Sequence, residues 1–123
     1  ISGISQRDWN EIIEAMRGVI TDPKGTARSI GYKAPYTLAG KSGTAQVFTL
    51  AQDTEYDAEE VTERMRDHAL FVAFAPIEEP QIAIAVVVEN GGSGSGVAAP
   101  IARAVMDAYL IPRELAGMEA SAQ

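Results

Sequence analysis

Residues 68–89 read HALFVAFAPIEEPQIAIAVVVE, and this stretch decides the fold. It holds two runs rich in β-branched, aromatic and other apolar residues, at 68–75 and 81–89, a composition typical of strands. The segment between them, 76–80, has the length and composition of a hairpin loop. We therefore predict two antiparallel strands joined by a short loop.

The second predicted strand should have two unlike faces, because successive side chains of a strand point to opposite sides. One face carries the larger residues Ile82, Ile84, Val86 and Val88. The other face carries the smaller residues Ala83, Ala85 and Val87. We expect a helix to lie close against the face with the smaller residues.

An amphipathic helix is predicted near the start of the chain. Residues 9–20 place apolar side chains at helical spacing, and Ser5 with Asp8 three residues later forms a capping box. The helix should end at the turn 22–25, because the proline in that turn cannot continue the hydrogen-bond ladder.

A second helix is predicted after the glycine and serine turn at 90–96. Apolar residues recur at helical spacing over 101–109, and the helix should stop at Ile111-Pro112. We expect residues 113–123 to form a flexible C-terminal tail.

The middle of the chain completes the predicted sheet. Residues 26–35 are predicted as a loop or short strand, and residues 36–50 as a strand whose glycines at 40–44 admit a close backbone approach. Residues 57–60 should cap a short acidic helix. The predicted fold class is α+β: an antiparallel three-stranded sheet with packed helices.

Composition narrows the possible functions. A hydrophobic content of 46% over 123 residues is typical of one compact domain, and the absence of cysteine excludes disulfide frameworks, cysteine-based zinc sites and thiol nucleophiles. The formal net charge of −7, to which the acidic segment 50–67 contributes most, argues against a nucleic-acid partner. No apolar run reaches the ~20 residues of a membrane-spanning helix. The first residue is Ile1 rather than methionine, so we expect a piece of a longer protein.

Three weak signals are explained more simply by structure than by chemistry. Gly40-Lys41-Ser42 matches the end of a phosphate-binding loop, but Pro35 stands where that motif has its first glycine. Residues 94–99 match G-x-G-x-x-A, but the following helix is the last predicted element, so no parallel strand completes a dinucleotide-binding unit. His68 is the only histidine and is predicted to be structural. We predict no metal site and no cofactor.

The strongest chemical signal is Lys41-Ser42-Gly43-Thr44 on the predicted strand 36–50. Two hydroxyls and a lysine can bind a small carboxylate, because the hydroxyls donate hydrogen bonds, the lysine adds a positive field and glycine lets a ligand approach the backbone. The pleat places Ser42 and Thr44 on one face and Lys41 on the other. From these four residues alone, an ordinary edge strand is the alternative.

The wider context of this motif resembles a known family. The segments 25–27 (GTA), 38–46 (LAGKSGTAQ), 68–76 (HALFVAFAP) and 88–92 (VENGG) resemble the C-terminal part of the transpeptidase domain of class B penicillin-binding proteins, most closely those of rod elongation. The resemblance covers nearly all of residues 5–110. It implies that residues 1–112 are the C-terminal portion of a penicillin-binding or serine β-lactamase-like transpeptidase fold, incomplete on its own.

The resemblance also implies roles for the motif residues. Ser42 and Thr44 would bind the carboxylate of a peptidoglycan stem peptide or of a β-lactam. The backbone N–H of Thr44 would serve as an oxyanion donor, Lys41 would hold the middle serine of the family's second motif, and Gly43 would keep the strand open to the acyl group. Lys41 and Thr44 are thus the expected catalytic residues.

The sequence departs from the family in one decisive respect. No serine in the chain has a lysine three residues later, and there is no Ser-x-Asn or Tyr-x-Asn, so the nucleophile and the second motif are missing. Acyl transfer needs a nucleophile with an adjacent base, so this chain alone is predicted to be inactive. We expect an N-terminal half of the same protein to supply Ser-x-x-Lys.

The function that the resemblance implies is a peptidoglycan D,D-transpeptidase that cross-links stem peptides in cell-wall elongation through a serine acyl-enzyme. It implies a place at the periplasmic face of the bacterial inner membrane, with the anchor outside this chain and a membrane glycosyltransferase as partner. A serine β-lactamase or β-lactam sensor of the same fold is one alternative. A non-catalytic binding module is another, because the nucleophile is absent.

Overall fold

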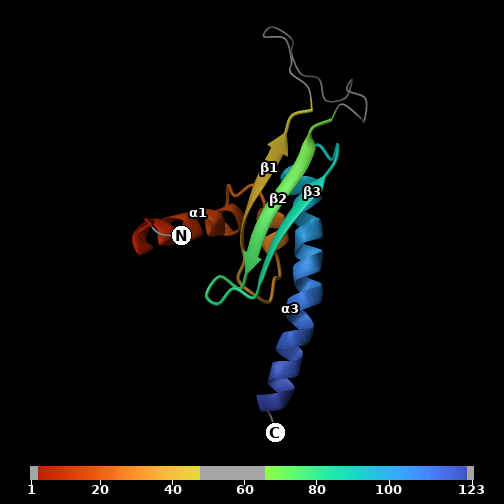
Figure 1. Cartoon of the computed structure of the whole chain (residues 1–123). Coiled ribbons are helices and arrows are strands. Elements are labelled where there is room, and N and C mark those ends of the chain that lie inside the picture. Colours follow the sequence, from red (N-terminus) through yellow and green to blue (C-terminus); the bar gives the residue numbers. More distant parts are fainter. Residues whose placement is uncertain (1–2, 48–65, 122–123) are drawn as a thin grey trace.

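Three antiparallel strands form one sheet in the computed structural model, which describes residues 3–47 and 66–121 (Figure 1). The strands are β1 (Ala39–Ala45), β2 (His68–Ala75) and β3 (Ile82–Val88), in the order β1-β2-β3. The predicted hairpin and the predicted antiparallel sheet with packed helices are confirmed. β1 is shorter than the predicted strand 36–50, whose last three residues lie outside the described part of the chain.

Helix α1 (Gln6–Thr21) begins at the predicted capping box. The N–H of Asp8 donates to Ser5 Oγ at 3.2 Å, and the N–H of Ser5 donates to Asp8 Oδ2 at 3.4 Å. The helix ends where predicted, and the side chain of Asp22 then accepts from the N–H of Lys24 at 2.7 Å. In Figure 1, α1 projects sideways from the sheet, and its C-terminal end is the end nearer to β1.

A short helix, α2 (Arg28–Gly31), lies where a loop or short strand was predicted. That prediction was wrong because tertiary burial, rather than local propensity, sets this turn. Ala27 and Ile30 are buried, and the N–H of Ile30 donates to the carbonyl of Ala27 at 3.2 Å. The acidic helix predicted at 57–60 lies outside the described residues.

The two faces of β3 are used in the opposite way to the prediction. Ile82, Ile84, Val86 and Val88 pack against the core, whereas the small face is exposed and Val87 is 62% exposed. Burying the larger side chains removes more apolar area from water. The small residues that let the C-terminal helix lie close to the sheet are instead on the helix side. They lie just before the helix and in its first turn, and include the fully buried Ala98, Ala99 and Ala102.

The C-terminal helix is longer than predicted. A π-helical turn, η2 (Gly94–Ala98), leads into α3 (Ala99–Ser121), which continues through Pro112. The predicted stop at Ile111-Pro112 is therefore wrong. Proline removes one N–H, and the carbonyl that loses this donor belongs to Ala108, which is exposed and can be hydrated. Flexibility of residues 113–123 stays a prediction.

One core joins the sheet to α3. Its largest fully buried side chains are Phe71 of β2 and Met106 of α3. In Figure 1, α3 runs beside the sheet and extends past one end of it. None of the helices in residues 3–47 and 66–121 has the length and apolarity needed to cross a membrane.

Candidate functional site

The motif Lys41-Ser42-Gly43-Thr44 lies on β1, an edge strand that pairs only with β2 within the described residues. Ser42 stands opposite Phe71, and Thr44 opposite Ala69. Directly opposed residues of an antiparallel pair share a face, so both hydroxyl residues lie on the same face of the sheet as the buried Phe71 and Ala69. At this edge Ser42 is nevertheless only half-buried, and Thr44 is exposed. This placement agrees with the predicted pleat.

The backbone of Ser42 and Thr44 faces the open edge of β1. A methyl group added to Gly94 would lie 2.5 Å from the carbonyl oxygens of both Gly43 and Leu70, so the backbone groups of this opposed pair point toward each other. Backbone groups of neighbouring strand residues point to alternate sides. We infer that the N–H groups of Ser42 and Thr44 point away from β2, which makes them available as donors.

Lys41 begins on the opposite face but its side chain folds back to Ser42. Lys41 Nζ donates to the carbonyl oxygen of Ser42 at 2.7 Å and to Ser42 Oγ at 3.4 Å. The first of these bonds is further evidence that the Ser42 carbonyl is at the open edge. The structure thus brings the predicted lysine and the first predicted hydroxyl together at one edge of the sheet.

Thr26 belongs to the same group of side chains, and sequence reasoning did not place it there. Thr26 Oγ1 lies 3.3 Å from Ser42 Oγ, although the two residues are far apart in sequence. The segment 25–27 contributed to the family resemblance, but its spacing from the motif predicted no contact. Only the packing of α1 against β1 brings them together.

The turn after α1 holds Thr26 in place. The N–H of Gly25 donates to the Asp22 carbonyl at 2.8 Å, and the N–H of Ala27 donates to the Val19 carbonyl at 3.1 Å. A methyl group on Gly25 would lie 2.4 Å from the Val19 oxygen, so only glycine fits so close to the helix end. A small cavity of about 300 Å³, lined by Thr26 and Lys41 among others, lies beside this turn.

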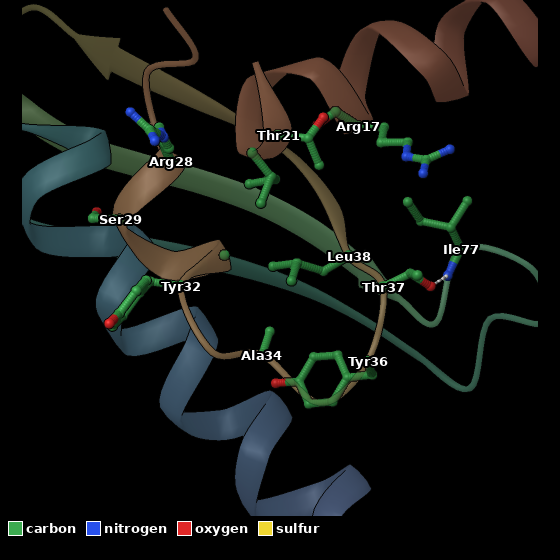
Figure 2. A pocket seen from close by; sticks show the side chains of 12 residues that line it. Arg17, Thr21, Arg28, Ser29, Tyr32, Ala34, Tyr36, Thr37, Leu38 and Ile77 are labelled. Atoms are coloured by element: carbon green, nitrogen blue, oxygen red, sulfur yellow. Dashed lines mark hydrogen bonds between the residues drawn. The ribbon is translucent and has the colours of Figure 1, made fainter. Parts of the chain in front are cut away.

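A larger cavity than this one lies elsewhere in the described part of the chain. It has a volume of about 770 Å³ and lies between α1, α2 and the segment leading into β1 (Figure 2). Its labelled side chains are Arg17, Thr21, Arg28, Ser29, Tyr32, Ala34, Tyr36, Thr37, Leu38 and Ile77. None of the predicted site residues lines it. The candidate site is therefore a strand edge and not this cavity.

The entry to β1 is held by a polar cluster on α3. Arg103 Nε donates to Asp107 Oδ1 at 2.8 Å, and the Tyr36 hydroxyl donates to the same oxygen at 2.6 Å. The Arg103 guanidinium also donates to the carbonyls of Ile30 and Tyr32. This cluster links α3 to the chain just before the motif strand, and the sequence carried no signal for it.

Electrostatics within this cluster follow from burial and hydrogen bonding. Burial, followed by the hydrogen bond to Asp107, raises the pKa of Tyr36 well above its ordinary value. Burial also raises the pKa of Asp107, but hydrogen bonds from Arg103 and Tyr36 and the charge of Arg103 outweigh it, so the net pKa is lowered. The cluster is thus a neutral phenol and an ion pair at neutral pH.

A second contact holds the segment before β1 at Thr37, the residue after Tyr36. Thr37 Oγ1 accepts from the N–H of Ile77 at 2.9 Å, the bond drawn in Figure 2, and its hydroxyl donates to Glu78. The hydrogen bond from Thr37 lowers the pKa of Glu78. These bonds join the segment to the β2–β3 loop.

His68 has a structural contact, in agreement with its predicted role. Its Nδ1 accepts from the N–H of Asn90 at 2.9 Å, which links the start of β2 to the turn after β3. In the described residues, no three His, Cys, Asp or Glu side chains gather in a way that could hold a metal ion.

Known proteins resemble this chain over most of its length. The family model described as penicillin binding protein transpeptidase domain matches residues 2–107. The chain is 43% identical over 105 residues to the peptidoglycan D,D-transpeptidase MrdA of Salmonella typhimurium (strain SL1344), which covers 85% of this chain and 17% of that protein. The chain thus spans less than a fifth of the length of this curated relative.

Solved structures of penicillin-binding proteins share the fold. Penicillin-binding protein 2 (PBP2) of Pseudomonas aeruginosa, in complex with WCK 5153, is 47% identical with a TM-score of 0.73, over 89% of this chain and 21% of that one. Penicillin-binding protein A of M. tuberculosis, solved as a penicillin G acyl-enzyme complex, is 29% identical with a TM-score of 0.58, over 87% of this chain and 21% of that one. Because the family model covers most of its length, this chain belongs to the penicillin-binding protein transpeptidase domain family.

Proposed function

We propose that the protein is a peptidoglycan D,D-transpeptidase and that this chain supplies one wall of its active site. The observation that carries the proposal is the open edge of β1, where Lys41 Nζ lies 3.4 Å from Ser42 Oγ. The outward direction inferred above for the backbone N–H groups of Ser42 and Thr44 supports it. Similarity to MrdA and to PBP2 supports the reaction class.

The substrate carboxylate would bind at this edge. The hydroxyls of Ser42 and Thr44 donate hydrogen bonds to the terminal carboxylate of a stem peptide, and Lys41 adds positive charge beside it. A β-lactam carries a carboxylate that can take the same place. The acyl-enzyme formed with penicillin G by the M. tuberculosis relative supports this ligand class.

The chemical step needs a serine from a part of the protein outside this chain. Its oxygen bonds to the carbonyl carbon of the penultimate stem residue as the hydroxyl proton passes to a base, and the amide bond to the terminal residue breaks as the leaving nitrogen takes that proton. The amine of a second stem peptide then displaces the serine. The N–H of Thr44 stabilises the oxyanion of each step, and such a donor contributes about 3 kcal/mol.

The setting of the reaction is part of the proposal. The enzyme would act in cell-wall elongation at the periplasmic face of the inner membrane, and thereby maintain cell shape. An N-terminal half of the same protein would carry Ser-x-x-Lys, and a membrane glycosyltransferase would be its partner. The names of the relatives support the reaction, and the family resemblance motivates the location and the partners.

Labelling of the full-length protein with a fluorescent penicillin tests the proposal. We expect label on the Ser-x-x-Lys serine, located by mass spectrometry, and a loss of labelling rate of about tenfold or more in Lys41→Ala. Lys24→Ala is the matched control, because Lys24 lines the same small cavity but lies outside the motif. Equal labelling of both variants would contradict the role of Lys41, and turnover of the label within seconds would instead favour a β-lactamase.

A further inference from the structure

We propose that Thr26 is a positioning residue of the carboxylate site: it donates its hydroxyl proton to Ser42 Oγ and thereby directs the Ser42 proton toward the ligand. The inference rests on the proposed function, since it assigns a task to a residue that the motif itself does not include. Its geometric basis is the 3.3 Å separation between Thr26 Oγ1 and Ser42 Oγ.

The hydrogen-bond inventory of Ser42 sets the direction of this bond. A serine hydroxyl has one proton to donate and two lone pairs that accept. Lys41 Nζ, an obligatory donor, lies 3.4 Å from Ser42 Oγ and uses one lone pair. If Thr26 donates to the other, the single proton of Ser42 is free.

A carboxylate ligand favours this arrangement over the reverse one. An ionised carboxylate only accepts hydrogen bonds, so it requires Ser42 to donate outward. Thr26 must then be the donor to Ser42 Oγ, and each bond in such a chain strengthens the next. A neutral ligand group at the same place would gain less from this arrangement, because hydrogen bonds to charged acceptors are the stronger ones.

The position of Thr26 is firm enough for this task although its side chain is exposed. The N–H of the next residue, Ala27, is bonded to the Val19 carbonyl at 3.1 Å, and Ala27 is fully buried. Gly25 precedes it in a turn where a methyl group would overlap the α1 carbonyls. Thr26 is therefore held on both sides by backbone contacts with α1.

The test compares two acylating agents on the full-length protein. Thr26→Val keeps the shape of the side chain but removes the hydroxyl, and Thr26→Ser keeps the hydroxyl. We measure the second-order acylation rate with a penicillin and with the methyl ester of the same penicillin. A penicillin should react about three- to tenfold more slowly with Thr26→Val, the ester should change less than about twofold, and Thr26→Ser should restore the penicillin rate.

The outcomes separate this inference from the proposed function. An equal loss of rate with both agents, or no loss in Thr26→Val, would overturn the positioning role while the wild type remains acylated. No acylation of the wild type by either agent would overturn the proposed function and this inference with it. The double variant Thr26→Val with Ser42→Ala should be no slower than Ser42→Ala alone, because Thr26 acts through Ser42; additive losses would count against that pathway.

Discussion

Replacing Arg103 by alanine should destabilise the domain far more than the loss of an exposed ion pair would. Arg103 joins α3 to the segment before β1 by donating to Asp107 at 2.8 Å and to the backbone carbonyls of Ile30 and Tyr32. Its side chain is only 17% exposed. The substitution removes the charged donor from Asp107 and the Ile30 carbonyl, whose bonds to Arg103 are partly buried, and from the Tyr32 carbonyl, whose bond is exposed.

The expected loss is about 3 kcal/mol. Hydrogen bonds to charged groups contribute about 1.5–3 kcal/mol each, and an acceptor left without a partner adds a desolvation cost. Because the pKa of Asp107 is lowered in the folded state, its ion pair contributes above the ordinary aspartate pKa of about 3.9. The difference between wild type and Arg103→Ala should therefore shrink as the pH falls through the lowered pKa.

Arg7→Ala is the matched control. Arg7 Nε also pairs with a carboxylate one helical turn away, Glu11 at 3.1 Å, but the two side chains are 87% and 66% exposed. Such a pair contributes less than about 0.5 kcal/mol. Urea denaturation of the transpeptidase domain, followed by far-ultraviolet circular dichroism, measures both losses. Equal shifts of the midpoint in the two variants would refute the reasoning.

Two further predictions concern the pH response and the support of the motif strand. Burial and a hydrogen-bonded carboxylate raise the pKa of Tyr36, so its stabilisation is present below about pH 10 and is lost as the pH rises further. Tyr36→Phe should lack this alkaline loss when the free energy of unfolding is measured by urea denaturation from about pH 9 to about pH 11. If that free energy fell with pH equally in the variant and the wild type, the prediction would be wrong. Gly94→Ala should lower both stability and penicillin labelling, because its methyl group would lie 2.5 Å from the carbonyl oxygens of Gly43 and Leu70. Gly18→Ala lies inside α1, where a methyl group meets nothing within 4 Å, and should instead stabilise the domain by about 0.5–1 kcal/mol. If Gly18→Ala destabilised the domain more than Gly94→Ala, the close backbone approach at Gly94 would not be what limits stability.

Much of the candidate site was predictable because its residues are adjacent in sequence. Lys41, Ser42 and Thr44 share one strand, so the pleat alone determines which faces they begin from. The folding of the Lys41 side chain back to Ser42, and the contact with Thr26, were not predictable. The contact with Thr26 depends on the packing of α1 against β1. The bond from Lys41 to the Ser42 carbonyl depends on the open edge of the sheet.

The wrong predictions about the fold also concern features that are decided by tertiary packing. The helix prediction stopped at Pro112 because a missing N–H is unfavourable in isolation, yet the freed carbonyl of Ala108 is exposed and can be hydrated. The helix α2 was missed because its single turn is fixed by the burial of Ile30 rather than by propensity. The face of β3 was assigned from side-chain size, whereas burial of the larger apolar area decided it.

Periodicity and local chemistry, read from the sequence by itself, determined the strands, the capped first helix, the antiparallel pairing of the hairpin and the motif of the family. These features depend on neighbours within a few residues, and alternation or helical spacing reports them directly. Only the tertiary structure decided which face of β3 meets α3, that Arg103 holds the entry to β1, and that Thr26 lies beside Ser42. Those contacts join residues distant in sequence, and their energies depend on burial and on the completed hydrogen-bond network, which exist only once the chain has packed.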